Sequence, residues 1–184
     1  MPAPLEAAHH RIANSFNFRV TLRKSGAGGA TTAGAPRPDS APAAAQAAPD
    51  FLGDGGFQEC TGLDIEMDAQ EVQEGGRNNG VVRLIGRGKY TNIVLKRGMF
   101  FATRGGANAE FWLWLQGILS GTRPVPRYDG MIEVLDDTGK RTLARWTFSR
   151  GLPVKVQGPQ LNAKSGEIAL EELHIAHEGL RLER

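Results

Sequence analysis

The chain has 184 residues, of which 40% are hydrophobic and 23% are charged. This length suits one domain with a flexible segment attached or inserted, and the apolar share is enough for a hydrophobic core. Its 22 basic and 20 acidic residues give a formal net charge of only +2, which does not mark a binder of polyanions such as nucleic acid.

The chain begins with a segment, residues 1–15, that is predicted to be a loose arm. Its opening sequence, Met1-Pro2-Ala3, lacks the basic and apolar regions of a secretory signal. No apolar stretch reaches the roughly 20 residues that span a bilayer. We therefore expect a protein made in the cytoplasm, without a membrane anchor.

The first strand is predicted at residues 16–22, where apolar residues alternate with Asn17, Arg19 and Thr21. A period of two predicts one buried and one solvated face. Residues 25–55 then turn to Ala, Pro and Gly, with no large apolar residue before Phe51. Such a segment cannot bury enough surface to offset its ordering entropy. We predict a flexible insertion within a single domain that spans residues 16–184.

A long β-hairpin is predicted over residues 63–85. On its first strand an apolar set alternates with a polar set; the sets are Leu63, Ile65, Met67 and Ala69, and Asp64, Glu66, Asp68 and Gln70. Turn residues at 75–80 separate this strand from a second one that begins at Val81. We expect the apolar set to be buried and the polar set to form the wet face.

Further strands are predicted at 92–97, 131–135, 143–152 and 168–182. In the last of them the alternation slips near Glu171-Glu172, which predicts a β-bulge.

One helix is predicted, with Asn108 as its N-terminal cap and Gly121 at its end. Its packing stripe is expected to consist of Phe111, Trp112, Leu115 and Ile118. Together the elements predict a β-rich (α+β) fold, an antiparallel β-sandwich or barrel-like domain with one packed helix.

The sequence contains no constellation that indicates an enzyme, a cofactor or a metal site. The Gly-rich segment 86–91 has Tyr90 where a phosphate-binding loop needs Ser or Thr, so we predict a flexible hairpin end there. His174 and His177 lie three apart on a predicted strand and would point to opposite faces, which disfavours a shared metal ion. Cys60 is the only cysteine and is predicted to be a small core residue.

Several short motifs follow one another in a recognisable order. They are Phe-Asn-Phe-Arg-Val at 16–20, Gly-Phe-Gln-Glu-Cys-Thr-Gly-Leu at 56–63, Glu-Val-Gln-Glu-Gly-Gly at 71–76, Lys-Tyr-Thr-Asn-Ile-Val-Leu-Lys-Arg-Gly at 89–98, the aromatic helix at 111–115, Pro-Val-Lys at 153–155, Gly-Pro-Gln-Leu-Asn-Ala-Lys at 158–164 and Ala-His-Glu-Gly-Leu at 176–180. This series resembles the tail tube protein family of contractile phages and the related tube proteins of extracellular contractile injection systems.

The resemblance implies a structural protein that forms a homo-hexamer, in which the strands of the subunits close into a ring around a channel. Rings would stack into a tube inside a contractile sheath, so the expected partners are adjacent rings, baseplate and sheath proteins, and cargo in the lumen. The balanced charge predicts no specific nucleic-acid site, and the resemblance places the assembled protein in a phage tail or tail-like particle. The hairpin is longer than one small core needs, and its expected inter-subunit residues are Asp64, Glu66, Asp68, Gln70 and Arg83.

The insertion departs from the family pattern, in which a short connection usually follows the first strand. Repeated in every ring, it would crowd the lumen or the sheath, which favours a tube initiator in the baseplate over a bulk tube subunit. The alternative is a self-contained β-rich module that binds cargo or carbohydrate, and such a module would be a monomer.

Overall fold

The computed structural model describes residues 16–26, 50–52, 56–73, 75–76, 80–100, 108–164 and 166–183. The arm expected at 1–15 and most of the expected insertion, 27–49 and 53–55, lie outside the described residues. In chain order the described elements are β1 (Phe18–Lys24), β2 (Phe51–Leu52), β3 (Phe57–Thr61), β4 (Ile65–Val72), β5 (Val82–Tyr90), β6 (Ile93–Gly98), α1 (Glu110–Leu119), β7 (Tyr128–Leu135), β8 (Thr142–Gln157), β9 (Leu170–Ala176) and β10 (Gly179–Glu183).

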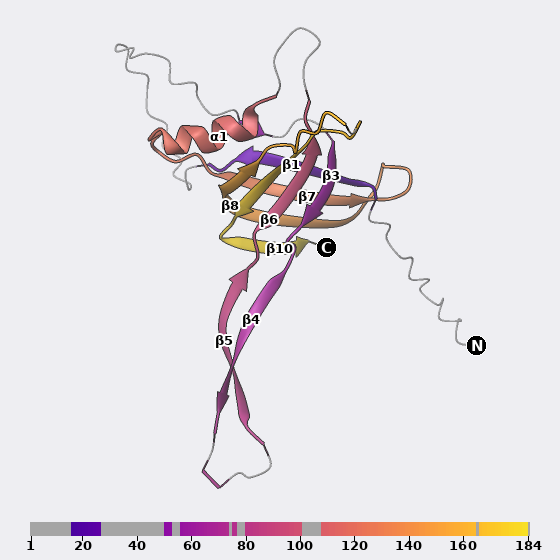
Figure 1. Ribbon diagram of the computed structural model, residues 1–184. Helices are drawn as coiled ribbons and strands as arrows, with labels where there is room; N and C mark the ends of the chain where they lie inside the picture. The colour runs from indigo at the N-terminus through magenta and orange to yellow at the C-terminus, as the bar shows by residue number, and fades with distance from the viewer. Residues whose placement is uncertain are drawn as a thin grey trace, which may run out of the picture.

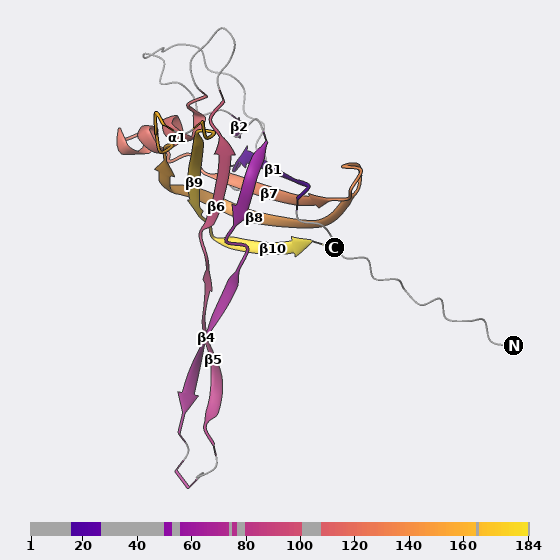
Figure 2. The ribbon, with the colours of Figure 1, turned by 45° about the vertical axis from the view of Figure 1, so that its right-hand side comes forward.

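The body of the molecule is an antiparallel sheet that folds over itself along one long strand. The strands pair in the order β2-β1-β7-β8-β9-β6-β3, and β10 also pairs with β8. The first part of β8 pairs with β7 and β10, and the part from Leu152 onward pairs with β9. Figures 1 and 2 show the resulting two layers, with β1, β7 and β10 running across β3 and β6.

The bend in β8 falls at Arg150 and Gly151. Arg150 has a positive φ of 55°, which is uncommon outside glycine. Its backbone N–H donates to the Asp129 carboxylate over 2.7 Å, which supports that conformation. A Cβ at Gly151 would lie 2.8 Å from the Tyr128 carbonyl oxygen on the paired strand and 2.8 Å from the Ile175 side chain on β9, so only glycine fits at this bend.

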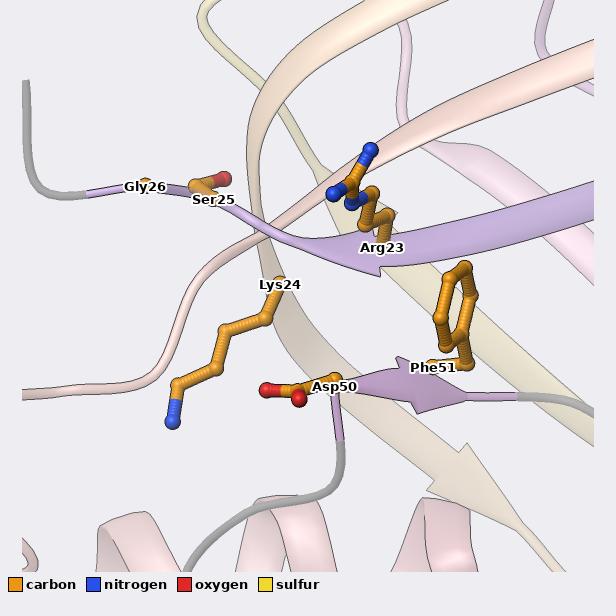
Figure 3. A pocket seen from close by; sticks show the side chains of 6 residues that line it. All are labelled: Arg23, Lys24, Ser25, Gly26, Asp50 and Phe51. Carbon is orange, nitrogen blue, oxygen red and sulfur yellow. The ribbon is translucent and has the colours of Figure 1, made fainter.

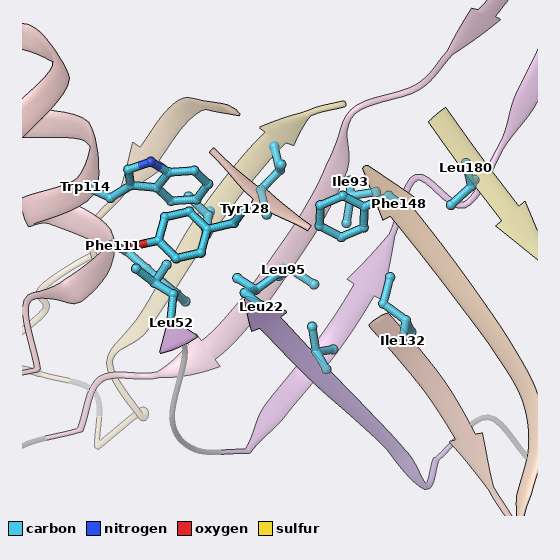
Figure 4. Close-up of a cluster of buried hydrophobic side chains, with 13 residues drawn as sticks. Leu22, Leu52, Ile93, Leu95, Phe111, Trp114, Tyr128, Ile132, Phe148 and Leu180 are labelled. Atoms are coloured by element: carbon cyan, nitrogen blue, oxygen red, sulfur yellow. The ribbon is translucent and has the colours of Figure 1, made fainter. Parts of the chain in front are cut away.

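The core lies between the two layers and under the helix. One layer contributes Leu22, Ile132, Tyr128 and Phe148, the other contributes Ile93, Leu95, Leu173 and Ile175, and all are almost fully buried (Figure 4). The helix closes one end with Phe111 and Trp114, and the Trp114 indole N–H donates to the Pro126 carbonyl over 2.9 Å. The predicted β-rich fold with one helix is therefore confirmed, and the described strands of the single subunit do not close into a barrel.

A buried ion pair joins two neighbouring strands on the core side of the sheet. Arg97 on β6 and Glu171 on β9 are both fully buried, with Nε and Oε1 2.6 Å apart. The Arg97 guanidinium also lies 3.8 Å above the centre of the Phe111 ring, and it donates to the Asn108 side chain over 3.3 Å. The pair therefore ties the sheet to the start of α1.

Glu171 explains why the sequence pattern predicts a bulge that β9 does not have. The predicted bulge near Glu171-Glu172 is wrong, because β6 and β9 pair without a shift from Gly98↔Leu170 to Ile93↔Ile175. Glu171 occupies an inward position next to Leu173, and a polar residue in an apolar row had looked like a change of phase. The irregularity lies on the neighbouring strand, where β8 carries an extra residue between Pro153 and Lys155.

Three other expectations need correction. The predicted last strand, 168–182, is two strands, because the chain turns at His177 and Glu178. The Gly-rich segment 86–91 is no flexible hairpin end, because its residues up to Tyr90 belong to β5. The predicted helix end is confirmed, since Gly121 has a φ of 93°. The predicted N-terminal cap is wrong by one residue, because the helix begins at Glu110 and Ala109 is the cap. Asn108 lies just before the cap, and its side chain accepts from the Glu110 N–H over 3.1 Å.

Candidate assembly interface

A hairpin of β4 and β5 projects from the body and forms a sheet of its own (Figures 1 and 2). All eight residues of β4 are exposed. An isolated two-stranded hairpin is at best marginally stable in water, because it has no second layer to cover either face. The hairpin is thus the part of this subunit that most needs a contact from outside.

The hairpin continues another strand pair. Thr61 pairs with Val94 in the β3–β6 ladder, and Ile65 pairs with Tyr90 in the β4–β5 ladder. Both strands advance by four residues between these pairs, so the register is the same on either side of the interruption. β3–β6 and β4–β5 are therefore one long hairpin with a break at residues 62–64 and 91–92.

The two faces of the projecting hairpin differ in chemistry. Residues that pair directly in an antiparallel ladder share a face. One face, called the apolar face below, carries the pairs Ile65↔Tyr90, Met67↔Gly88 and Ala69↔Ile85, and the other carries Glu66↔Lys89, Gln70↔Leu84 and Asp68. Met67 is 64% and Ile85 is 81% exposed. The expectation that the apolar set is buried is wrong for Ile65, Met67 and Ala69 in the single subunit, since no described layer covers them, whereas Leu63 is partly buried against the core.

The polar residues expected at an inter-subunit contact all lie on this hairpin or at its base. Asp64, Glu66, Asp68, Gln70 and Arg83 are all exposed. Lys89 Nζ lies 3.0 Å from Asp68, and Arg83 Nε lies 3.2 Å from Glu71, with all four side chains at least half exposed. Arg83 pairs with Glu71, which lies on the same face as the apolar row but nearer the far end of the hairpin. Arg83 therefore does not share a face with the other four residues.

A bulge interrupts the hairpin beside Asp68. The register shifts between Met67 and Ala69, and the extra residue lies on β5 at Gly86–Arg87. A Cβ at Gly86 would lie 2.8 Å from the Asp68 carbonyl oxygen, so glycine allows the close approach of the two backbones. Bulges increase the local twist, so this bulge sets the direction of the part of the hairpin beyond it.

The base of the hairpin borders a hollow of about 470 Å³. Tyr90 forms one side, and Phe148, Leu180 and Arg181 from β8 and β10 lie among its other lining residues. His177 lies at the same base, with its ring centre 5.3 Å from that of Tyr90 and 5.6 Å from that of Phe148. Burial lowers the pKa of His177 below its usual value, although the carbonyl groups of Thr91 and Gly179 act in the opposite direction.

The outer face of the β3–β6–β9 layer is polar. Lys96 Nζ lies 3.1 Å from Glu59 and 3.4 Å from Glu172, and hydrogen bonds to these carboxylates raise the pKa of Lys96. His174 Nε2 lies 3.4 Å from the same Glu172 side chain. Among the described strands, β3 pairs only with β6, and residues 152–157 of β8 pair only with β9. This layer therefore has an open edge on each side.

The helix packs with a slightly different stripe than expected. Phe111 is fully buried, and Ile118 contacts the core, but Trp112 and Leu115 are only half-buried. The second buried residue is Trp114, which the expected stripe did not include. Its spacing of three from Phe111 is also a helical spacing, so the signal was present but was assigned to the neighbouring residues.

A second hollow, of about 420 Å³, lies beside β1 and β2 (Figure 3). It is lined by Arg23, Lys24, Ser25, Gly26, Asp50 and Phe51, and the Arg23 guanidinium carbon lies 5.9 Å from the centre of the Phe51 ring. Phe51 and Leu52 form β2 against β1, and Leu52 enters the core, so these two residues of the predicted insertion are anchored.

Within the described ranges, no three His, Cys, Asp or Glu side chains are grouped as metal ligands would be. The described part of the chain contains no helix long and apolar enough to cross a membrane. The Cys60 thiol is half-buried against the core, and burial raises its pKa to about 12, far from that of a reactive thiol.

Comparisons with known proteins point in one direction. The family model of the T4-like virus tail tube protein gp19 matches residues 14–181. The chain is similar to a chain of the anti-feeding prophage baseplate, with a TM-score of 0.70 and 21% identity over 95% of this chain and 97% of that one. It is also similar to a chain of the PVC sheath–tube complex, an extracellular contractile injection system in its extended state, with a TM-score of 0.66 and 20% identity over 96% and 94% of the two chains.

A third similar structure is a chain of the anti-feeding prophage cap that terminates the tube, with a TM-score of 0.69 and 20% identity over 97% of this chain and 95% of that one. At these identities the structural likeness establishes the fold alone. No curated protein matches the sequence.

Proposed function

Because the chain belongs to the T4-like virus tail tube protein family, we propose that it is a structural subunit that forms or initiates the inner tube of a contractile tail or injection system. In this proposal it acts by assembly and not by catalysis. Its partners are other copies of itself, adjacent rings, and baseplate and sheath proteins. It assembles in the cytoplasm and ends in a phage tail or a tail-like particle.

The observation that carries the proposal is the uncovered hairpin. Proteins rarely expose an apolar strand face together with two unpaired strand edges unless another chain covers them. Here the exposed face includes Ile65, Met67 and Ile85, and it projects well away from the body (Figure 2). A neighbouring subunit, in the same ring or the next one, would cover this face.

The four-stranded layer of β3, β6, β9 and the end of β8 supports closure of a ring. The open edge of β3 in one copy could pair with the open edge of β8 in the next, so that the sheet continues from copy to copy without a gap. Head-to-tail contacts of this kind close into a ring when the rotation between copies allows it, and we propose a ring of six. The polar outer face with Glu59, Lys96 and Glu172 would then face the channel and its cargo.

We further propose that the chain is a tube initiator of the baseplate and not the bulk tube subunit. The support is the Ala-, Pro- and Gly-rich stretch at 25–55, which would have to be accommodated once per subunit along the whole tube. A protein used in one ring needs room for it only there.

Oligomeric state tests the proposal directly. Six copies of the 19.8 kDa chain have a mass of about 119 kDa, which mass photometry separates easily from a monomer. Rings that stack into tubes unaided would favour the bulk subunit, whereas rings that form only with baseplate proteins of the same particle would favour the initiator. A monomer under every condition would overturn the assembly role and favour the self-contained binding module.

Two neighbouring substitutions make the test specific to the apolar face. Ile85→Ser removes an apolar side chain from that face, and Leu84→Ser removes one from the opposite face of the same strand. We expect Ile85→Ser to weaken assembly and Leu84→Ser to have a smaller effect. Equal effects of the two substitutions would show that the apolar face is not the contact.

A further inference from the structure

The long hairpin has a break where it leaves the body. The ladders stop at Thr61↔Val94 and resume at Ile65↔Tyr90, so residues 62–64 and 91–92 form no ladder pair in the described structure. Gly62 adopts a φ of 84°, and a Cβ there would lie only 2.0 Å from the Asn92 carbonyl oxygen. The break is therefore compact, but few hydrogen bonds among its described residues fix the angle between the projecting hairpin and the body.

His177 is the side chain that bridges this break and the body. It comes from the turn between β9 and β10, and its Nε2 lies 3.1 Å from the Thr91 carbonyl oxygen at the hairpin base. Its Nδ1 lies 3.1 Å from the Gly179 carbonyl oxygen within its own turn. The ring is also placed between Tyr90 of the hairpin and Phe148 of the body, with centres 5.3 and 5.6 Å away.

We propose that His177 is a positioning residue that sets the direction of the β4–β5 hairpin, by donating a hydrogen bond from Nε2 to the Thr91 carbonyl. A neutral imidazole has one N–H, so only one of its two carbonyl neighbours can receive it. The bond to Thr91 restrains the hairpin, whereas the bond to Gly179 would restrain only the local turn. The charged neighbour, Glu178, is engaged by Arg127 and Arg150, each over 2.7 Å.

The remaining titratable or charged groups near the ring come from three neighbouring strands. Tyr90 packs from β5, and Asp129 and Arg181 line the adjacent hollow from β7 and β10. Burial lowers the pKa of His177 and so favours the neutral ring, which has a single N–H to donate.

A small change of angle at the base matters because the hairpin is long. The nine residues of β5 span about 30 Å at roughly 3.3 Å per residue, so a swing of about 10° moves the far end by about 5 Å. This displacement equals about one strand spacing, enough to move the apolar face out of register with a neighbour. The effect on assembly rests on the proposed function, but the effect on hairpin direction does not.

Two substitutions separate the two hydrogen bonds of His177. His177→Gln places an amide N–H near the position of Nε2 and can keep the bond to Thr91, whereas His177→Asn places it near Nδ1 and can keep only the bond to Gly179. Spin labels at Gln70→Cys on β4 and Leu119→Cys at the end of α1, in a Cys60→Ala background, report the hairpin direction as a distance distribution by pulsed electron paramagnetic resonance.

We expect one narrow distance for wild type and His177→Gln, and a distribution broadened or shifted by more than about 5 Å for His177→Asn. A narrow, unshifted distribution for His177→Asn, or equal broadening in both variants, would overturn the proposal. A second measurement needs no variant: nitrogen-15 NMR of the wild-type imidazole should show the Nε2–H tautomer, and the Nδ1–H tautomer would contradict the proposal.

Assembly assays on the same variants separate this proposal from the proposed function. A swinging hairpin in His177→Asn with intact assembly would leave His177 as the positioning residue and would overturn the role of the hairpin in assembly. A swinging hairpin with impaired assembly, rescued in His177→Gln, would support both.

Discussion

The body and the projecting hairpin have the same strand pattern but opposite surroundings. On β9, Leu173 and Ile175 alternate with polar residues and are fully buried between the two layers. On β4, Ile65 and Met67 alternate with carboxylates in the same way and are 58% and 64% exposed. A period of two thus identifies which face of a strand is apolar, but it does not say whether that face is covered by the same chain or by another.

The two regions also differ in how deeply their ion pairs are buried. The body buries Arg97 and Glu171 completely and pairs them at 2.6 Å, whereas the hairpin keeps Arg83 and Glu71 largely exposed. The first pair has replaced water with protein contacts, so its loss should be costly, and the second remains solvated in the single subunit.

The largest effect is expected from breaking the buried pair. Arg97→Met leaves the Glu171 carboxylate buried without its cation, and such a change costs about 3–5 kcal/mol of stability. Urea unfolding of the isolated subunit measures this cost. The double variant Arg97→Met/Glu171→Leu should recover much of it, because two apolar side chains need no partner. A single variant as stable as wild type would mean that water reaches Glu171.

Truncating apolar side chains should separate the two regions most clearly. Leu173→Ala leaves a cavity in the core and should destabilise the subunit by about 2–5 kcal/mol. Ile85→Ala removes a side chain that is 81% exposed, so its effect on the isolated subunit should stay within about 0.5 kcal/mol. If the two variants lose similar stability in urea, the apolar face of the hairpin is covered in the free subunit and the contrast fails.

Much of the body was predictable because its strands obey the alternation that burial imposes. The strand at Val20 and Leu22, the hairpin of β7 and β8 and the helix at Phe111 lie where the sequence predicted them. The inward position of Glu171 could not be predicted, because its partner Arg97 is 74 residues away in the chain and only the fold brings the two together. An inward polar residue has no local signal that distinguishes it from a bulge.

The candidate interface was predictable as an element but not in its faces. The sequence predicted the hairpin and its polar row, yet the register that puts Tyr90 and Ile85 beside Ile65 and Ala69 depends on the bulge at Gly86. The role of His177 was missed because no local pattern in the sequence indicates it. Its contacts with Thr91 and Tyr90 join segments that are far apart in the chain.

An intermediate effect is expected at the break between the two regions. Gly62→Ala adds a side chain at a φ of 84° and against the Asn92 carbonyl, so we expect a loss of about 1–3 kcal/mol. Gly80→Ala is the matched control, since its Cβ would meet nothing within 4 Å. It should be neutral or slightly stabilising. Equal behaviour of the two variants in thermal unfolding would mean that the break relaxes freely and does not constrain the hairpin.

The smallest effect is expected from the ion pair on the hairpin. Glu71→Gln removes the partner of Arg83, and because both side chains are more than half exposed, the isolated subunit should lose less than about 0.5 kcal/mol. The residual effect should shrink as salt is added, since exposed charges are screened within about 10 Å at 0.1 M ionic strength. Urea unfolding at low and high salt measures both quantities. A salt-independent loss of more than about 1 kcal/mol would mean that this end of the hairpin is desolvated before any partner binds, and the hairpin would then belong energetically to the body.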